Sequence, residues 1–210
     1  MSGIRITNSY PDIELIKKAV DVIQQGEVIV FPTTSLYGLG ASALSHESVQ
    51  KVFEIKERPI DKPLLILVND INQLAKIVDS IPTSALRIME HFWPGSVTLI
   101  FKAKPHLPEN LTAGTKTIGV RIPVHPIAQL LVNTLNMPIT ATSANISGKE
   151  GCSNIEYLDA KIKKKVSLIL DAGILASGAG STIVDVTQDP PRMIREGKIS
   201  FKQVMDILDK

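Results

Sequence analysis

Three cations stand within seven residues of one another in the segment Lys56-Glu57-Arg58-Pro59-Ile60-Asp61-Lys62-Pro63. An apolar run from Leu64 to Val68 follows at once and predicts a buried strand. Ammonium groups bind phosphate as point charges and guanidinium groups bind it as a bidentate fork, so this segment could clamp a polyphosphate. Cations at the end of a helix are also commonly solvated and favourable to the helix dipole. The segment alone leaves both interpretations open.

A single arginine, Arg121, interrupts the apolar strand predicted over Thr117 to Ile122. Burying a guanidinium group is costly unless an anion pairs with it. A ligand carboxylate and an internal salt bridge would each meet that need. Because open α/β sheets place their ligands at strand ends, the position of Arg121 favours the carboxylate.

Three segments combine hydroxyl side chains with glycine or alanine where a predicted strand begins or ends: 31–40, 140–148 and 178–182. Hydroxyls suit a small polar substrate, and small residues let a ligand approach the backbone closely. Each segment also fits an ordinary junction between strand and loop, in which Ser and Asn form turn hydrogen bonds. Taken singly, these segments do not decide between a ligand site and a turn.

The motifs of the common nucleotide-binding and hydrolase scaffolds are missing: G-x-x-x-x-G-K-[ST], G-x-G-x-x-G after the first strand, G-x-S-x-G and H-E-x-x-H. Cys152 is the one cysteine, so the chain has no intrachain disulfide, and we interpret this residue as an ordinary loop residue. The four histidines share no metal-ligand spacing, which predicts no metal site. Lysines 161 and 163–165 are interpreted as a solvated basic stretch, with contact to RNA phosphates as the alternative.

Helices and strands alternate along the chain. Apolar residues at helical spacing between Pro11 and Gly26 predict a first helix. Further helices are predicted near 48–56, 83–92, 126–135 and 200–208, and strands at 27–32, 64–68, 97–102, 117–122, 139–142, 167–171, 182–186 and 192–195. Several of the later strands are too close together for helical crossovers, so we expect an α/β fold with a twisted, mixed parallel and antiparallel sheet flanked by helices. Loops at 104–116 and 147–154 adjoin strand ends, where function is expected.

Length and composition bound the class of protein. A chain of 210 residues, 44% of them hydrophobic, can bury a full core, so we expect a single domain over 1–210. A formal net charge of +2 is too small to mark a nucleic-acid-binding protein by composition. The N-terminus lacks the apolar core of a signal peptide and no apolar run is long enough to span a bilayer, so we expect a cytoplasmic protein without membrane contact.

Taken together and in order, these segments resemble the YrdC-type threonylcarbamoyl-AMP synthases over about residues 10–200. Joint occurrence makes the resemblance far more specific than any one segment does. The shared motifs are Pro-Thr-x-x-x-Tyr-Gly-Leu-Gly at 32–40, Lys-x-Arg-x-x-x-Lys-Pro at 56–63, Phe-Trp-Pro-Gly at 92–95, Val-Arg-Ile-Pro at 120–123, Ser-Ala-Asn-Ile-Ser-Gly at 143–148, Ser-Thr-Ile-Val-Asp at 181–185 and Ile-Arg-Glu-Gly at 194–197.

The resemblance implies a YrdC-like fold with a basic concave cleft, in the short form that lacks an extra C-terminal domain. It implies a nucleotidyltransferase that joins L-threonine, bicarbonate and ATP into threonylcarbamoyl-AMP and releases pyrophosphate. ATP would be a substrate, with Mg²⁺ held mainly by the nucleotide. A separate threonylcarbamoyl-transferase machinery would move the product to an adenosine beside the tRNA anticodon, and direct tRNA or RNA binding is possible.

Roles for individual residues also follow from the resemblance. The catalytic cations would be Lys56, Arg58 and Lys62, which meet the ATP phosphates. The ATP site would further include Thr117, Ser143, Gly151 and Arg195, and the threonine site Ser35, Leu67, Arg121, Ala141 and Ser181. The chain departs from the family pattern at Thr34-Ser35, where an acidic residue and Thr are common, and at Ser96, where Pro is common. No side chain is an obvious general base, so catalysis would depend on positioning and electrostatics.

Two other functions remain as alternatives. The first is an RNA-binding module, for double-stranded RNA or tRNA, that performs no chemistry. The second is a carbamoyl-adenylate domain of the kind found in hydrogenase-maturation proteins, although the chain carries neither the zinc-finger nor the acyl-phosphatase domain of those proteins. Dependence of pyrophosphate release on threonine and bicarbonate would distinguish the synthase from the binding module.

Overall fold

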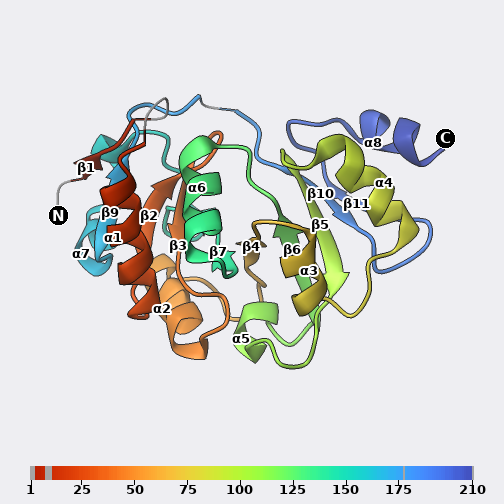
Figure 1. Ribbon diagram of the computed structural model, residues 1–210, viewed down its shortest axis with the longest axis horizontal. Helices are drawn as coiled ribbons and strands as arrows, with labels where there is room; N and C mark the ends of the chain where they lie inside the picture. Colours follow the sequence, from red (N-terminus) through yellow and green to blue (C-terminus); the bar gives the residue numbers. More distant parts are fainter. Residues whose placement is uncertain (1–2, 8–10, 177, 210) are drawn as a thin grey trace.

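The computed structural model describes residues 3–7, 11–176 and 178–209, which form two β-sheets with helices packed against them (Figure 1). Both sheets mix parallel and antiparallel pairs, as the sequence predicted. The first sheet has the strand order β1 (Ile4–Arg5), β9 (Leu168–Asp171), β2 (Ile29–Pro32), β3 (Tyr37–Gly40) and β8 (Thr142–Ser143).

The second sheet is built mainly from the later part of the chain. Its parallel pairs join β10 to β5 and β4 to β6. Its strand order is β11 (Arg192–Arg195), β10 (Thr182–Asp185), β5 (Val97–Lys102), β6 (Thr117–Arg121), β4 (Leu65–Leu67) and β7 (Ile139–Thr140).

The two sheets meet where β7 continues into β8 through Ala141. Within this one extended segment, Ile139 pairs with Leu67 in the second sheet and Thr142 pairs with Leu39 in the first. The buried Thr140 hydroxyl donates to the Leu39 carbonyl at 3.1 Å and thereby fixes the junction. The strand predicted at 139–142 therefore exists, but it is divided between two sheets.

Helices α1 (Ile13–Gln24) and α6 (Pro126–Leu135) pack against each other and against β2 (Figure 1). The Asp12 side chain accepts from the backbone N–H groups of Glu14 and Leu15, which explains why α1 begins there. The remaining helices are α2 (His46–Lys56), α3 (Ile71–Ile77), α4 (Thr83–Phe92), α5 (Glu109–Thr112), η1 (Ile155–Tyr157), α7 (Ala160–Lys165) and α8 (Phe201–Leu208).

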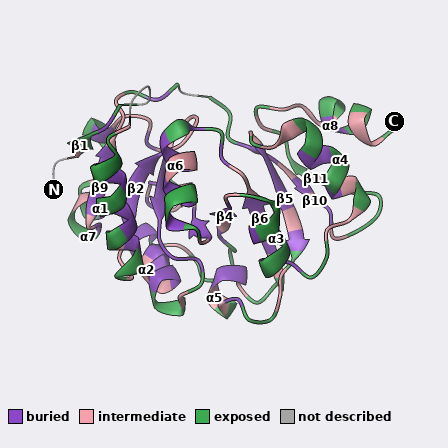
Figure 2. Ribbon diagram, viewed as in Figure 1, coloured by how far each residue is buried: buried purple, intermediate pink, exposed green. Residues whose placement is uncertain are grey.

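At strands β5, β6 and β10 the second sheet is packed against helices on one face. Val97 and Leu99 of β5 belong to the same buried cluster as Ile88 of α4 and Val204 of α8. In β6 the alternate residues are only partly buried, because they lie on the opposite face of the pleat. Figure 2 shows that burial is concentrated on the strands, whereas the helices are exposed on their outward sides. One face of the second sheet is thus left for a cavity.

The bounds of α4, α6 and β5 agree with the prediction, whereas β3 was missed because Gly38 and Gly40 suggested a loop. The Phe31 ring packs over both glycines, and a Cβ on Gly40 would lie 2.9 Å from Phe31 Cε1. Pairing with β2 and β8 makes this segment a strand. Helices α3, α5 and α7 and strand β1 were also unpredicted, and α5 lies inside the predicted loop 104–116. Over the described ranges, the search for a helix long and apolar enough to cross a bilayer found none.

Candidate functional site

A cavity of about 350 Å³ lies where the two sheets meet. Its wall is formed by the β2–β3 turn, the loop after α2, the ends of β4 and β6, the β7–β8 segment, the residues before β10, and β11. Three arginines and no acidic residue belong to the described part of this wall. It brings together seven of the predicted site residues: Ser35, Arg58, Arg121, Ala141, Ser143, Ser181 and Arg195.

Arg121 lies at the end of β6, beside β4. Its Nε atom is buried and has no hydrogen-bond partner among the described atoms. Burial and, to a smaller extent, the positive charge of Arg195 together lower the pKa of Arg121 to about 10. The side chain is still protonated at neutral pH, so a partly buried cation faces the cavity without an anion from the described chain.

Arg58 and Arg195 are each anchored to backbone oxygens. Arg58 donates through Nε to the Lys62 carbonyl at 3.0 Å and through Nη2 to the Pro63 carbonyl at 2.9 Å. Arg195 donates through Nη2 to the Ser181 carbonyl at 2.7 Å. Each guanidinium group carries five N–H donors, so both retain donors for an anion in the cavity. Burial lowers the pKa of Arg58, and the nearby Asp61 carboxylate opposes that shift.

Lys56, at the last position of α2, does not line the cavity. Its side chain is 1% exposed, and Nζ donates to the carbonyl oxygens of Ser143 and Asn145 and to Asn145 Oδ1. Burial is the main cause that lowers the pKa of Lys56, to about 7. In this conformation Lys56 connects the end of α2 to the turn after β8, and its three possible donors are all in use.

Two of the serines that line the cavity, Ser181 and Ser143, are hydrogen-bonded to other side chains. Ser181 is 8% exposed, and its Oγ accepts a 2.8 Å hydrogen bond from the buried hydroxyl of Thr98. On the other wall, Ser143 Oγ donates to Asn145 Oδ1. Ser35 lies in the turn that Thr33 closes by donating from its hydroxyl to the Leu36 carbonyl at 2.6 Å. Thr98 was missed because a single threonine in an apolar strand suggests ordinary core packing.

Four predicted site residues besides Lys56 also lie outside the cavity wall. Leu67 is fully buried in the core beneath α1 and α6, although its register partner is Arg121. Thr117 begins β6 and bonds to Thr115 through the two hydroxyls at 2.9 Å. Lys62 is exposed on the loop after α2, and its carbonyl rather than its ammonium group takes part in the site.

Gly151, the fourth of these residues, lines a neighbouring cavity of about 350 Å³ together with Asn145 and Cys152. A Cβ on Gly151 would lie 2.5 Å from Leu36 Cδ1, and Leu36 lines the first cavity. Cys152 is buried, its Sγ donates to the Asn154 carbonyl at 3.0 Å, and burial raises the pKa of its thiol. Each of these features disfavours a thiolate nucleophile.

Most of the lysines of α7 already have partners. Lys161 pairs with the Glu57 carboxylate at 2.7 Å, Lys163 donates to the Glu156 carbonyl, and Lys165 donates to the Glu54 carbonyl. These contacts attach α7 to η1 and to α2.

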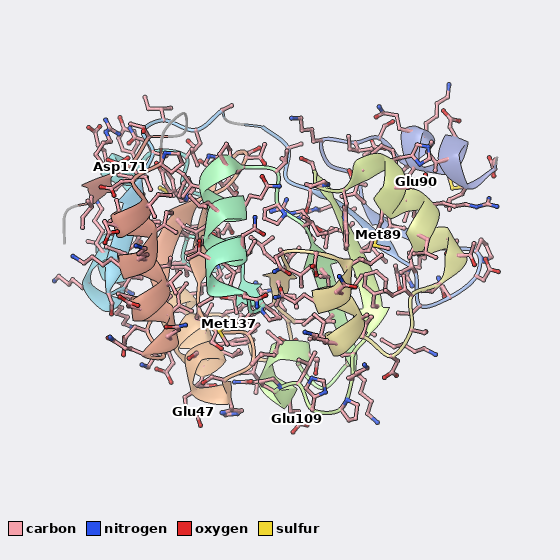
Figure 3. All side chains as sticks on the ribbon, in the orientation of Figure 1. Glu47, Met89, Glu90, Glu109, Met137 and Asp171 are labelled. Carbon is pink, nitrogen blue, oxygen red and sulfur yellow. The ribbon has the colours of Figure 1, made fainter. Side chains whose placement is uncertain are left out.

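At the opposite end of β9, Asp171, labelled in Figure 3, receives hydrogen bonds from Arg5 and from the backbone of Gly173. Within the described ranges, no group of three or more His, Cys, Asp or Glu side chains is arranged to hold a metal ion.

The fold and the cavity define an α/β protein with a cavity at the junction of two mixed sheets, lined by three guanidinium groups that form no ion pair with a described acidic side chain. A family model described as "Telomere recombination", named for Sua5, YciO and YrdC, matches residues 21–197. The chain belongs to this Sua5/YciO/YrdC family.

Three relatives illustrate the match. A Bacillus subtilis threonylcarbamoyl-AMP synthase is 37% identical over 92% of this chain and 56% of its own length. The crystal structure of Pyrococcus abyssi Sua5 complexed with L-threonine superposes with a TM-score of 0.94 at 34% identity, covering 99% of this chain and 61% of that one. Escherichia coli YciO superposes with a TM-score of 0.87 at 31% identity, covering 97% and 98%. The chain thus spans somewhat more than half the length of the first two proteins.

Proposed function

We propose that this chain makes threonylcarbamoyl-AMP from L-threonine, bicarbonate and ATP, with release of pyrophosphate. The observation that carries the proposal is Arg121, a partly buried cation whose buried Nε atom has no partner and which has no anion among the described residues. It lines a cavity together with two further arginines. A ligand carboxylate and phosphates would supply the missing negative charge and make this wall the basic cleft expected from the sequence. The relatives named as threonylcarbamoyl-AMP synthase, and the L-threonine complex of Sua5, support the same assignment.

In the proposed complex, Arg121 binds the threonine carboxylate, and Ser35, Ala141 and Ser181 enclose the rest of the amino acid. Arg58 and Arg195 bind ATP phosphates from the two sides of the cavity. Arg58 and Arg195 each donate to a backbone carbonyl, so their orientations are set before the ligand arrives. Preorganised donors of this kind stabilise charge that develops in a transition state.

The residues outside the wall have narrower proposed roles. Thr117, Lys62 and Gly151 would contact ATP only where the nucleotide extends beyond the cavity, and Leu67 would act as backing for Arg121. Lys56 would have to give up its carbonyl partners to reach a phosphate, so we propose that it mainly supports Ser143.

The reaction proposed for the cavity has two steps. The threonine amine attacks bicarbonate with loss of water, or CO₂ with loss of a proton to solvent, and forms a carbamate. A carbamate oxygen then attacks the α-phosphorus of ATP as pyrophosphate leaves. The described wall contains no His, Cys, Asp, Glu or Lys side chain to act as a general base. Positioning and electrostatic stabilisation would therefore provide the catalysis, as is common in phosphorus-centred transfer.

Mg²⁺ is part of the proposal as a companion of ATP. Carboxylates are the usual protein ligands of Mg²⁺, and the described wall offers hydroxyls but no carboxylate. The donor set therefore fits an ion held by the nucleotide phosphates, which would neutralise charge on the leaving pyrophosphate when bound. The arginines of this chain would act on the same phosphates without coordinating the metal.

The proposed product is an activated intermediate, so a threonylcarbamoyl-transferase machinery acting on tRNA in the cytoplasm would consume it. The alternative of an RNA-binding module has weaker support. Three lysines of α7, the most basic stretch of the chain, are engaged with acceptors on α2 and η1. An RNA backbone would have to compete with those contacts.

Pyrophosphate release from ATP, with threonine and bicarbonate withheld in turn, tests the proposal. We expect release only when all three substrates are present. Arg58→Ala should lower threonine-dependent release by about 100-fold or more, because a charged donor to the phosphates is lost. Arg87→Ala, which removes an exposed arginine of α4, is the matched control and should stay near the unaltered rate. Release that needs neither threonine nor bicarbonate, or near-normal turnover of Arg58→Ala, would refute the proposal.

A further inference from the structure

Thr98 is a polar residue in the apolar strand β5. It is 1% exposed, and its neighbours Val97 and Leu99 both pack in the hydrophobic cluster that includes residues of α4 and α8. Alternation along the strand therefore places its side chain on the cavity face of the second sheet, away from α4 and α8. Its register partner in β10 is Ile183, which lines the cavity.

The environment of Thr98 fixes its orientation. Its methyl group packs over Gly119 of β6, where an added Cβ would lie 3.3 Å from Thr98 Cγ2. One step beyond the pair of Leu99 with Val120, the antiparallel register brings Thr98 beside Arg121. Thr98 thus lies directly beneath the residues that face the ligand space.

The hydroxyl of Thr98 donates to Ser181 Oγ at 2.8 Å, and the Ser181 carbonyl accepts from Arg195 at 2.7 Å. Ser181 is therefore held at two points, and one lone pair of its hydroxyl is occupied. Its own hydroxyl hydrogen has no acceptor among the described residues. A hydroxyl that accepts from one side donates to the other, so this hydrogen is directed to an acceptor in the cavity.

We infer that Thr98 is a positioning residue that makes Ser181 a hydrogen-bond donor to the carboxylate of the bound amino acid. This inference rests on the proposed function, because it assigns the acceptor as the threonine carboxylate held by Arg121. Without the Thr98 hydroxyl, the Ser181 hydroxyl rotates freely, and its hydrogen is no longer directed to the carboxylate. The expected loss is part of the contribution of one hydrogen bond to a charged group, because the Ser181 hydroxyl itself remains, and corresponds to a fall of about 5- to 10-fold in affinity for threonine.

The test measures binding of L-threonine to the full chain by calorimetry, for the unaltered protein and for Thr98→Val, Thr98→Ser, Ser181→Ala and the double variant Thr98→Val/Ser181→Ala. Valine keeps the shape of threonine and removes the hydroxyl, whereas serine keeps the hydroxyl. We expect Thr98→Val to bind about 5- to 10-fold more weakly, Thr98→Ser to bind within about twofold of the unaltered protein, and the double variant to bind no more weakly than Ser181→Ala.

Thr112→Val is the matched control, since Thr112 is also buried and uses its hydroxyl within the chain, but it lies on α5 outside the cavity wall. It should keep the unaltered affinity. If Thr98→Val does not fold, Thr98→Ala carries the same comparison.

The outcomes separate two failures. Unchanged threonine affinity in the Thr98 variants, or a further loss when Thr98→Val is added to Ser181→Ala, would overturn this inference and leave the proposed function standing. Absence of threonine binding by the unaltered protein would overturn the proposed function, and the inference with it.

Discussion

Lys56 is buried and Arg121 is partly buried near the same cavity, yet the surroundings of these two cations are opposite. Lys56 uses all three of its donors on oxygens of two residues: Ser143, at the end of β8, and Asn145, in the turn that follows. Arg121 has a buried Nε without a partner in the described chain and faces the ligand space. Lys56 thus stabilises a wall of the cavity, whereas Arg121 is available for a ligand.

The comparison teaches that residue type alone does not separate structure from function here. Both residues are cations within motifs shared with the family, and both were expected to bind substrates. What separates them is whether the folded chain supplies their partners. A charged group that the fold leaves without a partner lowers the stability of the free protein, and a bound ligand restores that stability. Removing Arg121 should therefore lower affinity without lowering stability, whereas removing Lys56 should mainly lower stability.

Arg121→Met gives the largest expected effect. Methionine keeps an unbranched stem and removes the charge, so threonine affinity should fall about 100-fold or more. The free energy of unfolding without ligand should stay the same or rise, because an uncompensated, partly buried cation is lost. Calorimetric titration with L-threonine and urea unfolding measure the two quantities. A clear loss of stability would mean that Arg121 has an internal partner, and the contrast with Lys56 would fail.

Lys56→Met should show the reverse pattern. Three oxygens lose their donors, and the relief of a desolvated lysine offsets only part of that cost, so we expect a loss of about 2 kcal/mol in the free energy of unfolding. Threonine affinity should fall by less than about tenfold, since Lys56 does not line the cavity. Urea unfolding at neutral pH is the measurement, with Lys18→Met, at an exposed position on α1, as the control. A loss of activity with unchanged stability would instead assign Lys56 to the phosphates.

The contrast between Arg121 and Lys56 also shows which features of the site could be predicted from the sequence. The need of Arg121 for an anion was predictable, because a lone arginine in an apolar strand has a known desolvation cost. The contacts of Lys56 were not predictable, because they depend on how the end of α2 packs against a turn 87 residues further along the chain. The orienting role of Thr98 is likewise visible only once β5 and the segment before β10 are adjacent.

Secondary structure follows a similar division. Strong apolar periodicity predicted α4, α6 and β5 with their observed bounds. Strand β3 was hidden by its glycines, which are required because the Phe31 ring lies against them. The family resemblance named twelve site residues, of which seven line one cavity. The division of the cavity wall between two sheets at Ala141 could not be predicted, because it depends on tertiary pairing.

His125, just before α6, extends the comparison to a third buried nitrogen group and gives the smallest expected effect. Its Nδ1 has no partner among the described atoms, and burial lowers its pKa to about 4. Unlike the two cations, it has neither internal oxygens nor a place in the cavity wall, so the folded protein keeps it neutral.

Between pH 6.5 and 4 the unfolded chain therefore binds a proton at His125 that the folded protein does not bind. Stability from this group is fully present above pH 6.5 and is lost as the pH falls toward 4, by at most about 1.4 kcal/mol per pH unit. His125→Asn should lessen the decrease in the free energy of unfolding between pH 7 and pH 5, measured by urea titration at each pH. His91→Asn, at an exposed position on α4, should leave that decrease unchanged. Equal acid sensitivity in the unaltered protein and His125→Asn would show that the fold supplies this imidazole with a partner, and would place it with Lys56 among the satisfied groups.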